Sequence, residues 1–172
     1  GNAATGVIID NSTQIRATTP PHAAGVVDVS VTTPGGTGTK TGGFTYMAAP
    51  TVSAISPSAG PLAGGTAVTI TGTNFNSLAT VTIGGNAATG VIIDNSTQIR
   101  ATTPAHDAGA VDVSVTTPGG TGTKTNSFIY LPTYTVTYNG NGSISGTAPT
   151  DASSPYLSGV TVTILGNTGG LA

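Results

Sequence analysis

Two histidines are the strongest candidates in this chain for a side chain that does chemistry. His22 and His106 lie 84 residues apart, each one or two residues after a proline in a segment expected to be a loop. A histidine can act as a general base or bind a metal, but either role needs polar partners close by. Asp107 follows His106, whereas Ala23 follows His22. We therefore expect both histidines to be structural, and we predict no catalytic residue, no cofactor and no metal site.

Two Asp-Asn pairs suggest a second kind of chemistry. Asp10-Asn11 and Asp94-Asn95 carry oxygen atoms of the kind that Ca²⁺ binds. The same residues favour turns, because their side chains hydrogen-bond to nearby backbone groups. We expect turns at both places.

A Gly-rich segment ending in lysine occurs twice, at residues 35–41 and 119–125. A phosphate-binding loop needs glycine directly before the lysine and a helix after it. Thr39 and Thr123 precede the two lysines, and a strand is expected next. The sequence predicts hairpin loops here.

Lys124, Asp112 and Asn126 raise the hypothesis of a lysine–asparagine crosslink formed beside a buried carboxylate. Lys124 is expected in an exposed loop, which argues against that chemistry. An intact mass lower by roughly 17 Da, the loss of one ammonia, would reveal the bond.

The composition favours an all-β fold. The 172 residues include 34 threonines, 14 serines, 26 glycines and 11 prolines. Threonine, valine and isoleucine fit pleated sheet surfaces, while glycine and proline mark turns. The net charge is −2 with only four basic residues, which excludes a surface that binds nucleic acid through its phosphates.

Membrane and cysteine chemistry are also excluded within this segment. No apolar run reaches the roughly 18–20 residues of a membrane-spanning helix, so we expect no membrane insertion. The first residues lack the charged and apolar regions of a signal peptide. Without cysteine there is no disulfide and no thiolate metal site.

An internal repeat organises the chain. Residues 1–46 align without gaps on residues 85–130. The copies differ at only six positions, which are Pro21/Ala105, Ala23/Asp107, Val26/Ala110, Gly42/Asn126, Gly43/Ser127 and Thr45/Ile129. A period of 84 residues fits one small β-sandwich per unit. The sequence predicts a complete domain at 49–131 and, at 1–48, the second half of another.

The complete unit predicts seven or eight short strands. Apolar and polar residues alternate, as at Val111, Val113 and Val115, which places the valines on one face. Turn residues recur every eight to twelve positions, which is typical of a sandwich. We expect strands at 52–55, 66–71, 79–83, 91–93, 98–102 and 110–116, a last strand ending at 128–130, a turn at 56–61 and a loop at 118–122.

Residues 50–131 resemble the IPT/TIG domain. The similarity rests on a series of motifs, which are Ser56-Pro57-x-x-Gly60-Pro61, Gly64-Gly65-Thr66, Ile70-Thr71-Gly72-x-Asn74-Phe75, Val81-x-Ile83-Gly84-Gly85, Ile99-x-Ala101-x-x-Pro104 and Phe128-x-Tyr130. The resemblance implies an immunoglobulin-like β-sandwich. It implies no single function, because the module serves as spacer, dimer interface or DNA clamp in different hosts.

Residues 132–172 change character. Residues 134–138 alternate as a strand would, residues 139–142 form an Asn-Gly-Asn-Gly turn signal, and a further strand is expected at 160–165. The pattern is similar to part of a Listeria–Bacteroides-type repeat, a β-grasp-like module of bacterial surface proteins such as internalins. The connections at 47–49 and 131–133 are short, so stiff joints are expected.

These observations favour a non-catalytic structural segment of a large secreted or cell-surface bacterial repeat protein. A stalk, an adhesin shaft or an extracellular fibre subunit would fit, with neighbouring repeats or copies of itself as partners. The half-unit leaves Val27, Val29 and Val31 uncovered, so we predict a strand-complementation surface there.

The alternative function is an accessory module that binds a glycan or a host or cell-surface protein. Sugar sites commonly present aromatic platforms. The chain has no tryptophan, and the candidate platforms are Tyr134, Tyr138 and Tyr156.

Overall fold

The computed structural model of the chain describes residues 1–139, 146–163 and 165. This part consists of strands, turns and irregular segments without a helix, so it holds no helix that could cross a membrane. The chain divides into two compact units, Gly1–Ala48 and Ala49–Ala172. The predicted all-β class is confirmed.

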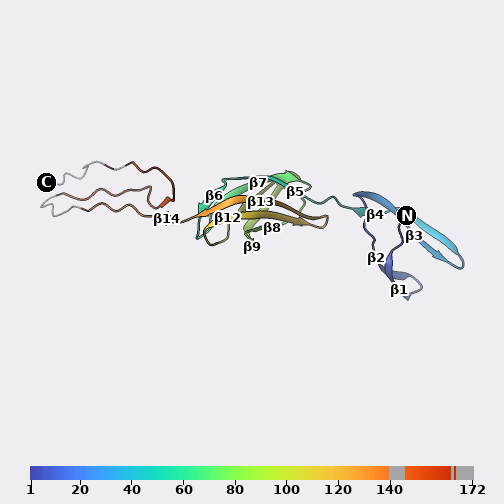
Figure 1. Cartoon of the computed structure of the whole chain (residues 1–172). Coiled ribbons are helices and arrows are strands. Elements are labelled where there is room, and N and C mark those ends of the chain that lie inside the picture. The colour runs from blue at the N-terminus through green and yellow to red at the C-terminus, as the bar shows by residue number, and fades with distance from the viewer. Residues whose placement is uncertain (140–145, 164, 166–172) are drawn as a thin grey trace. The chain divides into compact units, whose positions relative to one another are not determined.

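Residues 49–131 form an immunoglobulin-like sandwich of two sheets (Figure 1). One sheet has the strand order β10-β11-β7-β5, with bounds Thr89–Asn95, Gln98–Thr102, Ala67–Thr73 and Thr51–Ser56. The other has the order β6-β13-β12-β8-β9, with bounds Ala59–Pro61, Gly120–Leu131, Gly109–Thr117, Thr80–Ile83 and Asn86–Ala87. The expected strands are present, with ends that differ from the expectation by at most two residues.

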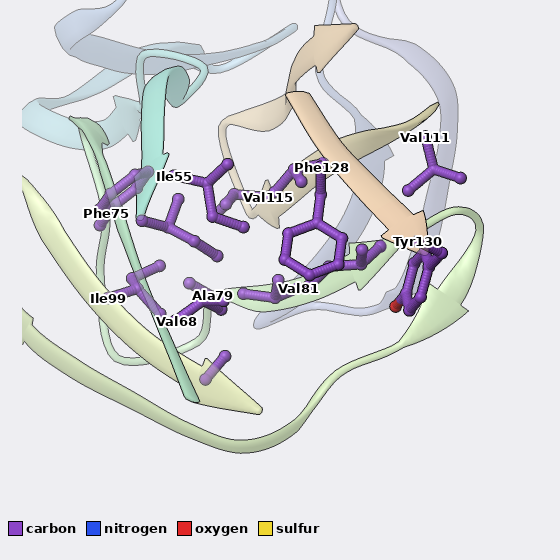
Figure 2. Close-up of a cluster of buried hydrophobic side chains, with 14 residues drawn as sticks. Ile55, Val68, Phe75, Ala79, Val81, Ile99, Val111, Val115, Phe128 and Tyr130 are labelled. Carbon is purple, nitrogen blue, oxygen red and sulfur yellow. The ribbon is translucent and has the colours of Figure 1, made fainter. Parts of the chain in front are cut away.

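The core lies between the sheets and follows the predicted alternation (Figure 2). Ile70 on β7, Ile99 on β11, and Val113 and Val115 on β12 are fully buried. Complete burial of such a side chain contributes about 1.5–3 kcal/mol relative to leaving it in water. Phe128 on β13 is also fully buried, so both sheets supply large apolar groups to one core.

Two segments of the sandwich differ from the expectation. Residues 59–61 were expected within a turn but form β6, which pairs in parallel with the end of β13. The Ile129 N–H donates to the carbonyl oxygen of Ser58 at 2.9 Å, so β6 covers an otherwise open edge. The hairpin loop is shorter than the expected 118–122, because Thr117 already pairs with Gly120.

The polypeptide enters and leaves the sandwich at opposite ends of β13. Gly122, near the start of β13, has no room for a Cβ because the Pro50 carbonyl group occupies that space. The strand then continues to Leu131, where the chain leaves the domain. Nine residues at about 3.3 Å each separate the two ends by roughly 30 Å.

Residues 1–48 form two hairpins in two separate sheets. Their strands are β1, β2, β3 and β4, with bounds Thr5–Asn11, Gln14–Thr18, Gly25–Thr33 and Gly36–Tyr46. The register repeats that of the complete domain: Ile9 faces Ile15 as Ile93 faces Ile99. No side chain in this unit is buried, and Pro20, Val27 and Tyr46 are half-buried.

The segment after the sandwich contains only a short ladder among its described residues. β14, Thr133–Tyr134, pairs with β15, Tyr156–Leu157. The expected strand at 134–138 is therefore wrong beyond Tyr134, and residues 160–163 form no strand. Alternation did not suffice because these residues have no ladder partner in the described part. Most of the turn expected at 139–142 lies outside the described residues.

Candidate functional site

A histidine stacks on a tyrosine at one end of the sandwich. The ring centroids of His106 and Tyr130 are 5.0 Å apart and their planes differ by 21°. The Tyr130 hydroxyl donates to the carbonyl oxygen of Pro104 at 2.7 Å. Burial raises the pKa of Tyr130, because the phenolate form would lose its hydration. The same stack and hydrogen bond recur in the first copy between Tyr46, His22 and Pro20.

The surroundings of His106 give it a packing role. Its Nδ1 donates to the carbonyl oxygen of Asp107 at 2.8 Å, since a carbonyl can only accept. The other edge of the ring meets Gly84, where an added Cβ would lie 2.5 Å from Cδ2 and Nε2. In the described residues, no three His, Cys, Asp or Glu side chains gather where they could hold a metal.

A hollow of about 480 Å³ lies beside this histidine and is lined by Leu62, Asn86, Ala105, His106 and Asp107. Asn86 Nδ2 donates to the carbonyl oxygen of Ala105 at 3.2 Å. Two of the residues that line this hollow, Ala105 and Asp107, stand at positions that differ between the copies. The first copy therefore does not repeat the chemistry of this hollow.

The carboxylates that suggested calcium are bound to arginine instead. Asp94 accepts hydrogen bonds from Arg100 at 2.7–3.0 Å. These bonds, and one from Gln98, hold the pKa of Asp94 below its ordinary value. Asn95 Oδ1 accepts hydrogen bonds from the backbone N–H and the hydroxyl of Thr97, both at 2.8 Å. These bonds form the turn that the sequence predicts.

The ion pair was missed in the sequence although the first copy repeats it. Asp10 accepts two hydrogen bonds at 2.7 Å, which Arg16 donates from two of its nitrogen atoms. These bonds lower the pKa of Asp10. A signal was present: each acid lies six residues before its arginine, across an expected tight hairpin. The register of such a hairpin brings the two side chains close together.

The residues of the crosslink hypothesis do not provide a buried carboxylate. Asp112 is exposed, and its Oδ1 accepts from the backbone N–H of Asn126 at 2.9 Å. This bond spans an irregularity in the β12–β13 ladder between Val111 and Val113. Lys124 lies on β13 rather than in the expected loop, and it is exposed. Asp112 thus stabilises a bulge.

The three valines of the predicted complementation surface lie on β3. Val29 and Val31 are 43% and 42% exposed, and Val27 is half-buried. Their counterparts Val113 and Val115 are 0% exposed. The same sequence thus presents an apolar face in one unit and a core in the other.

Of the three tyrosines of the predicted ligand platform, two face each other in a ladder and the third lines a hollow. Tyr134 is 61% exposed and lies opposite Tyr156 in the β14–β15 ladder. The Tyr156 hydroxyl donates to the Asp151 carboxylate at 2.8–2.9 Å, and this bond raises the pKa of Tyr156. Tyr138, but neither of the others, lines a hollow of about 450 Å³ together with Asp151.

Comparison with protein families identifies the sandwich. The family model for the IPT/TIG domain matches residues 1–46 and 50–130. Both the complete sandwich and the pair of hairpins therefore match the same family, which agrees with the repeat in the sequence.

Individual relatives are much longer than this chain. Human fibrocystin-L is 37% identical over 87 residues, which are 51% of this chain and 2% of that protein. Mouse fibrocystin-L is 30% identical over 126 residues, 73% of this chain and 3% of that protein. The chain thus spans only a few hundredths of the length of the curated relatives it matches.

A solved structure shows a similar fold. The plexin A4 extracellular region, domains 1 to 10, matches with a TM-score of 0.51 and 23% identity, over 78% of this chain and 13% of that one. This likeness concerns the fold alone.

Proposed function

The chain belongs to the IPT/TIG domain family, and from that premise we propose that it is a non-catalytic structural segment of a larger extracellular repeat protein. The proposed setting is a secreted or cell-surface protein of bacterial type, in which the segment forms part of a stalk, an adhesin shaft or a fibre. Neighbouring repeats are its proposed partners.

The positions at which the polypeptide enters and leaves the sandwich carry this proposal. Pro50 packs against Gly122, and the chain leaves at Leu131 roughly 30 Å further along β13. A domain with its ends at opposite poles transmits tension along its length. The parallel pairing of β6 with β13 joins the second strand of the sandwich to its last strand, so tension between the ends loads these hydrogen bonds together.

The contacts of the polar residues also favour a structural role. His106, Asp94, Asp112 and Tyr130 are each engaged with a neighbour in the same domain. Those contacts hold a loop, a hairpin, a bulge and a strand end in place. In none of these four contacts does a second catalytic group orient the side chain toward a substrate.

The proposed domain organisation is an IPT/TIG half-unit at 1–48, a complete IPT/TIG domain at 49–131 and a partial Listeria–Bacteroides-type module at 132–172. The family match to residues 50–130 and the division of the chain after Ala48 support the first two. The third rests on the sequence pattern and on the short β14–β15 ladder.

Stretching the whole chain between its ends by force spectroscopy tests the structural role. Unfolding of residues 50–131 should release roughly 250 Å of chain in one step, from about 3.5 Å per residue less the folded length. Ile129→Pro removes the N–H that bonds to Ser58 and should lower the unfolding force. Ile129→Thr, the residue of the other copy, keeps the N–H and is the matched control.

Two outcomes of the force experiment would contradict the proposal. If the chain extends without a resisted step, or if both Ile129 variants unfold at the wild-type force, the domain is not held by its terminal strands. A load-bearing role would then be excluded.

A second candidate function is glycan binding by the segment after the sandwich. The hollow of about 450 Å³ combines the Tyr138 ring with the Asp151 carboxylate, and an aromatic ring beside a polar acceptor suits a sugar. Calorimetric titration of the whole chain with oligosaccharides tests it, with Tyr138→Ala as the variant and Tyr134→Ala as the control outside the hollow.

A further inference from the structure

The tip of the β10–β11 hairpin carries the sequence Asn95-Ser96-Thr97, and the same three residues stand at 11–13. An asparagine two residues before a serine or threonine, with no proline between them, is the pattern of an acceptor for N-linked glycans. Because so short a pattern also arises by chance, the exposure and the hydrogen bonds of the tip decide what it can do here.

The backbone of this tip is fixed while its side chains remain in solvent. The ladder of β10 and β11 closes at Asn95, so Ser96 and Thr97 form the turn. The carbonyl oxygens of Ser96 and Thr97 accept hydrogen bonds from the N–H groups of Phe75 and Gly72, each at 3.0 Å. Residues 95–97 are nevertheless all exposed. A group attached to the Asn95 side chain would therefore extend into solvent without displacing a packed residue.

The amide of Asn95 makes hydrogen bonds through its oxygen atom alone. Oδ1 accepts from the backbone N–H and from the hydroxyl of Thr97, both at 2.8 Å, and within the described residues Nδ2 has no partner. Asn11 accepts the same two bonds from Thr13, also at 2.8 Å. Two donors on the oxygen polarise the amide and make its N–H more acidic. A new bond at Nδ2 would leave both bonds to Oδ1 in place.

The other asparagines with side-chain hydrogen bonds lack one part of this arrangement. Nδ2 already donates to a backbone carbonyl oxygen in Asn2, Asn74 and Asn86. Asn76 comes closer, because its Oδ1 accepts from the N–H of Leu78 at 3.0 Å, but leucine has no hydroxyl. Within the described residues, only the two Asn-Ser-Thr tips combine an unbonded Nδ2 with a hydroxyl that donates to Oδ1.

We propose that Asn95, and Asn11 at the equivalent tip, accept an N-linked glycan. The donor is a sugar whose anomeric carbon carries a phosphate ester of a nucleotide or of a lipid. Nδ2 forms a bond to the anomeric carbon while the bond from that carbon to the phosphate oxygen breaks. The electron pair leaves with the phosphate, and the Nδ2 proton passes to a base of the transferring enzyme. This inference goes beyond the proposed structural role and does not depend on it.

Peptide masses of the whole chain, recovered from the cells that naturally produce it, test the proposal. Trypsin cleaves after Arg16, Lys40, Arg100 and Lys124, which places the two tips on the separate peptides 1–16 and 41–100. Both peptides should be heavier than calculated. Peptides 17–40 and 101–124 contain no asparagine and should have their calculated masses.

The size and the position of the added mass complete the test. A single hexose, roughly 162 Da, would indicate a nucleotide-linked donor, and a larger oligosaccharide a lipid-linked one. Fragmentation of peptide 41–100 should place the added mass on Asn95. Calculated masses for both tip peptides, or an added mass on threonine or serine, would overturn the proposal.

Three variants produced in the same cells isolate the hydroxyl. Thr97→Val keeps the backbone N–H but removes the hydroxyl, so peptide 41–100 should lose its glycan while peptide 1–16 retains it. Thr97→Ser keeps the hydroxyl and should keep the glycan. Leu78→Thr gives Asn76 the donor that it lacks and should add a second glycan to peptide 41–100. Both positions are exposed, so unchanged melting temperatures should accompany all three changes.

Two results from the variants would contradict the proposal. A glycan that persists in Thr97→Val, or the absence of a second glycan in Leu78→Thr, would overturn the role of the hydroxyl and with it the proposed site. The force experiment is independent, because it reads the pairing of β6 with β13: a glycan on Asn95 without mechanical resistance would remove the shaft function and retain the acceptor site.

Discussion

The hydroxyl of Tyr130 donates to the carbonyl oxygen of Pro104 at 2.7 Å, which joins the last strand of the sandwich to a loop 26 residues earlier. The side chain of Tyr130 is fully buried and Pro104 is half-buried. Tyr46 makes the same bond to Pro20 in a unit without a core. The two copies therefore allow the bond to be tested at a fully buried tyrosine and at a half-buried one.

Tyr130→Phe should lower the free energy of unfolding by about 1–2 kcal/mol, because the half-buried Pro104 carbonyl loses its donor while the ring remains. Chemical denaturation of the whole chain measures this. Tyr46→Phe is the matched control and should leave the main transition unchanged. Equal midpoints for Tyr130→Phe and the unaltered chain would contradict the expectation.

Alkaline pH should destabilise the sandwich through the same residue. Burial raises the pKa of Tyr130 in the folded state, so above the ordinary value near 10 the unfolded chain releases a proton that the folded chain retains. The contribution of Tyr130 to stability is full below that value and is lost as the pH rises through the higher, folded pKa. The decline in melting temperature should be smaller in Tyr130→Phe; an identical decline would assign it to other groups.

Gly84→Ala should be more damaging than Gly85→Ala. Both glycines have positive φ, at 62° and 81°, so both substitutions strain the backbone by about 1–2 kcal/mol. Only at Gly84 does the new Cβ also meet the His106 ring. Adding His106→Ala should recover part of the Gly84→Ala loss in thermal denaturation, and no recovery would place the whole effect in the backbone.

Acid should weaken the hairpin that carries Asp94. Hydrogen bonds from Arg100 lower the pKa of Asp94, so its contribution is present above the ordinary value near 4 and is lost as the pH falls through the lower, folded value. The pair is exposed at the surface, so the effect should be small and reduced by salt. In Arg100→Gln, the melting temperature should fall less as the pH is lowered. An unchanged decline would show that the ion pair does not contribute to the acid sensitivity.

The sandwich was predictable because its information is local and repeated. Alternation at Val111, Val113 and Val115 specifies a strand with one buried face, and the structure confirms it. The near-identity of residues 1–46 and 85–130 defines the repeat unit without reference to any strand. Conversely, β6 was not predictable from its own residues, because its strand geometry depends on pairing with Ile129, about 70 positions away.

The candidate sites were less predictable for a related reason. The Asp94-Asn95 pair predicts a turn, and the pairing of Asp94 with Arg100 appears only when the hairpin is folded. The alternating residues after Tyr134 show the opposite case, since a strand pattern without a partner does not form a ladder in the described part of the chain. An alternating sequence predicts a strand, but the strand forms only where a partner strand is available for pairing.

The placement of the entry and exit points at the two ends of β13 has a consequence for inheritance. In the repeat protein proposed above, inserting or deleting one period of 84 residues would add or remove one whole unit. The contacts within each sandwich would stay the same, so no unit would need compensating substitutions. The length of the proposed protein would then change in steps of one domain, with the fold of each domain unaltered.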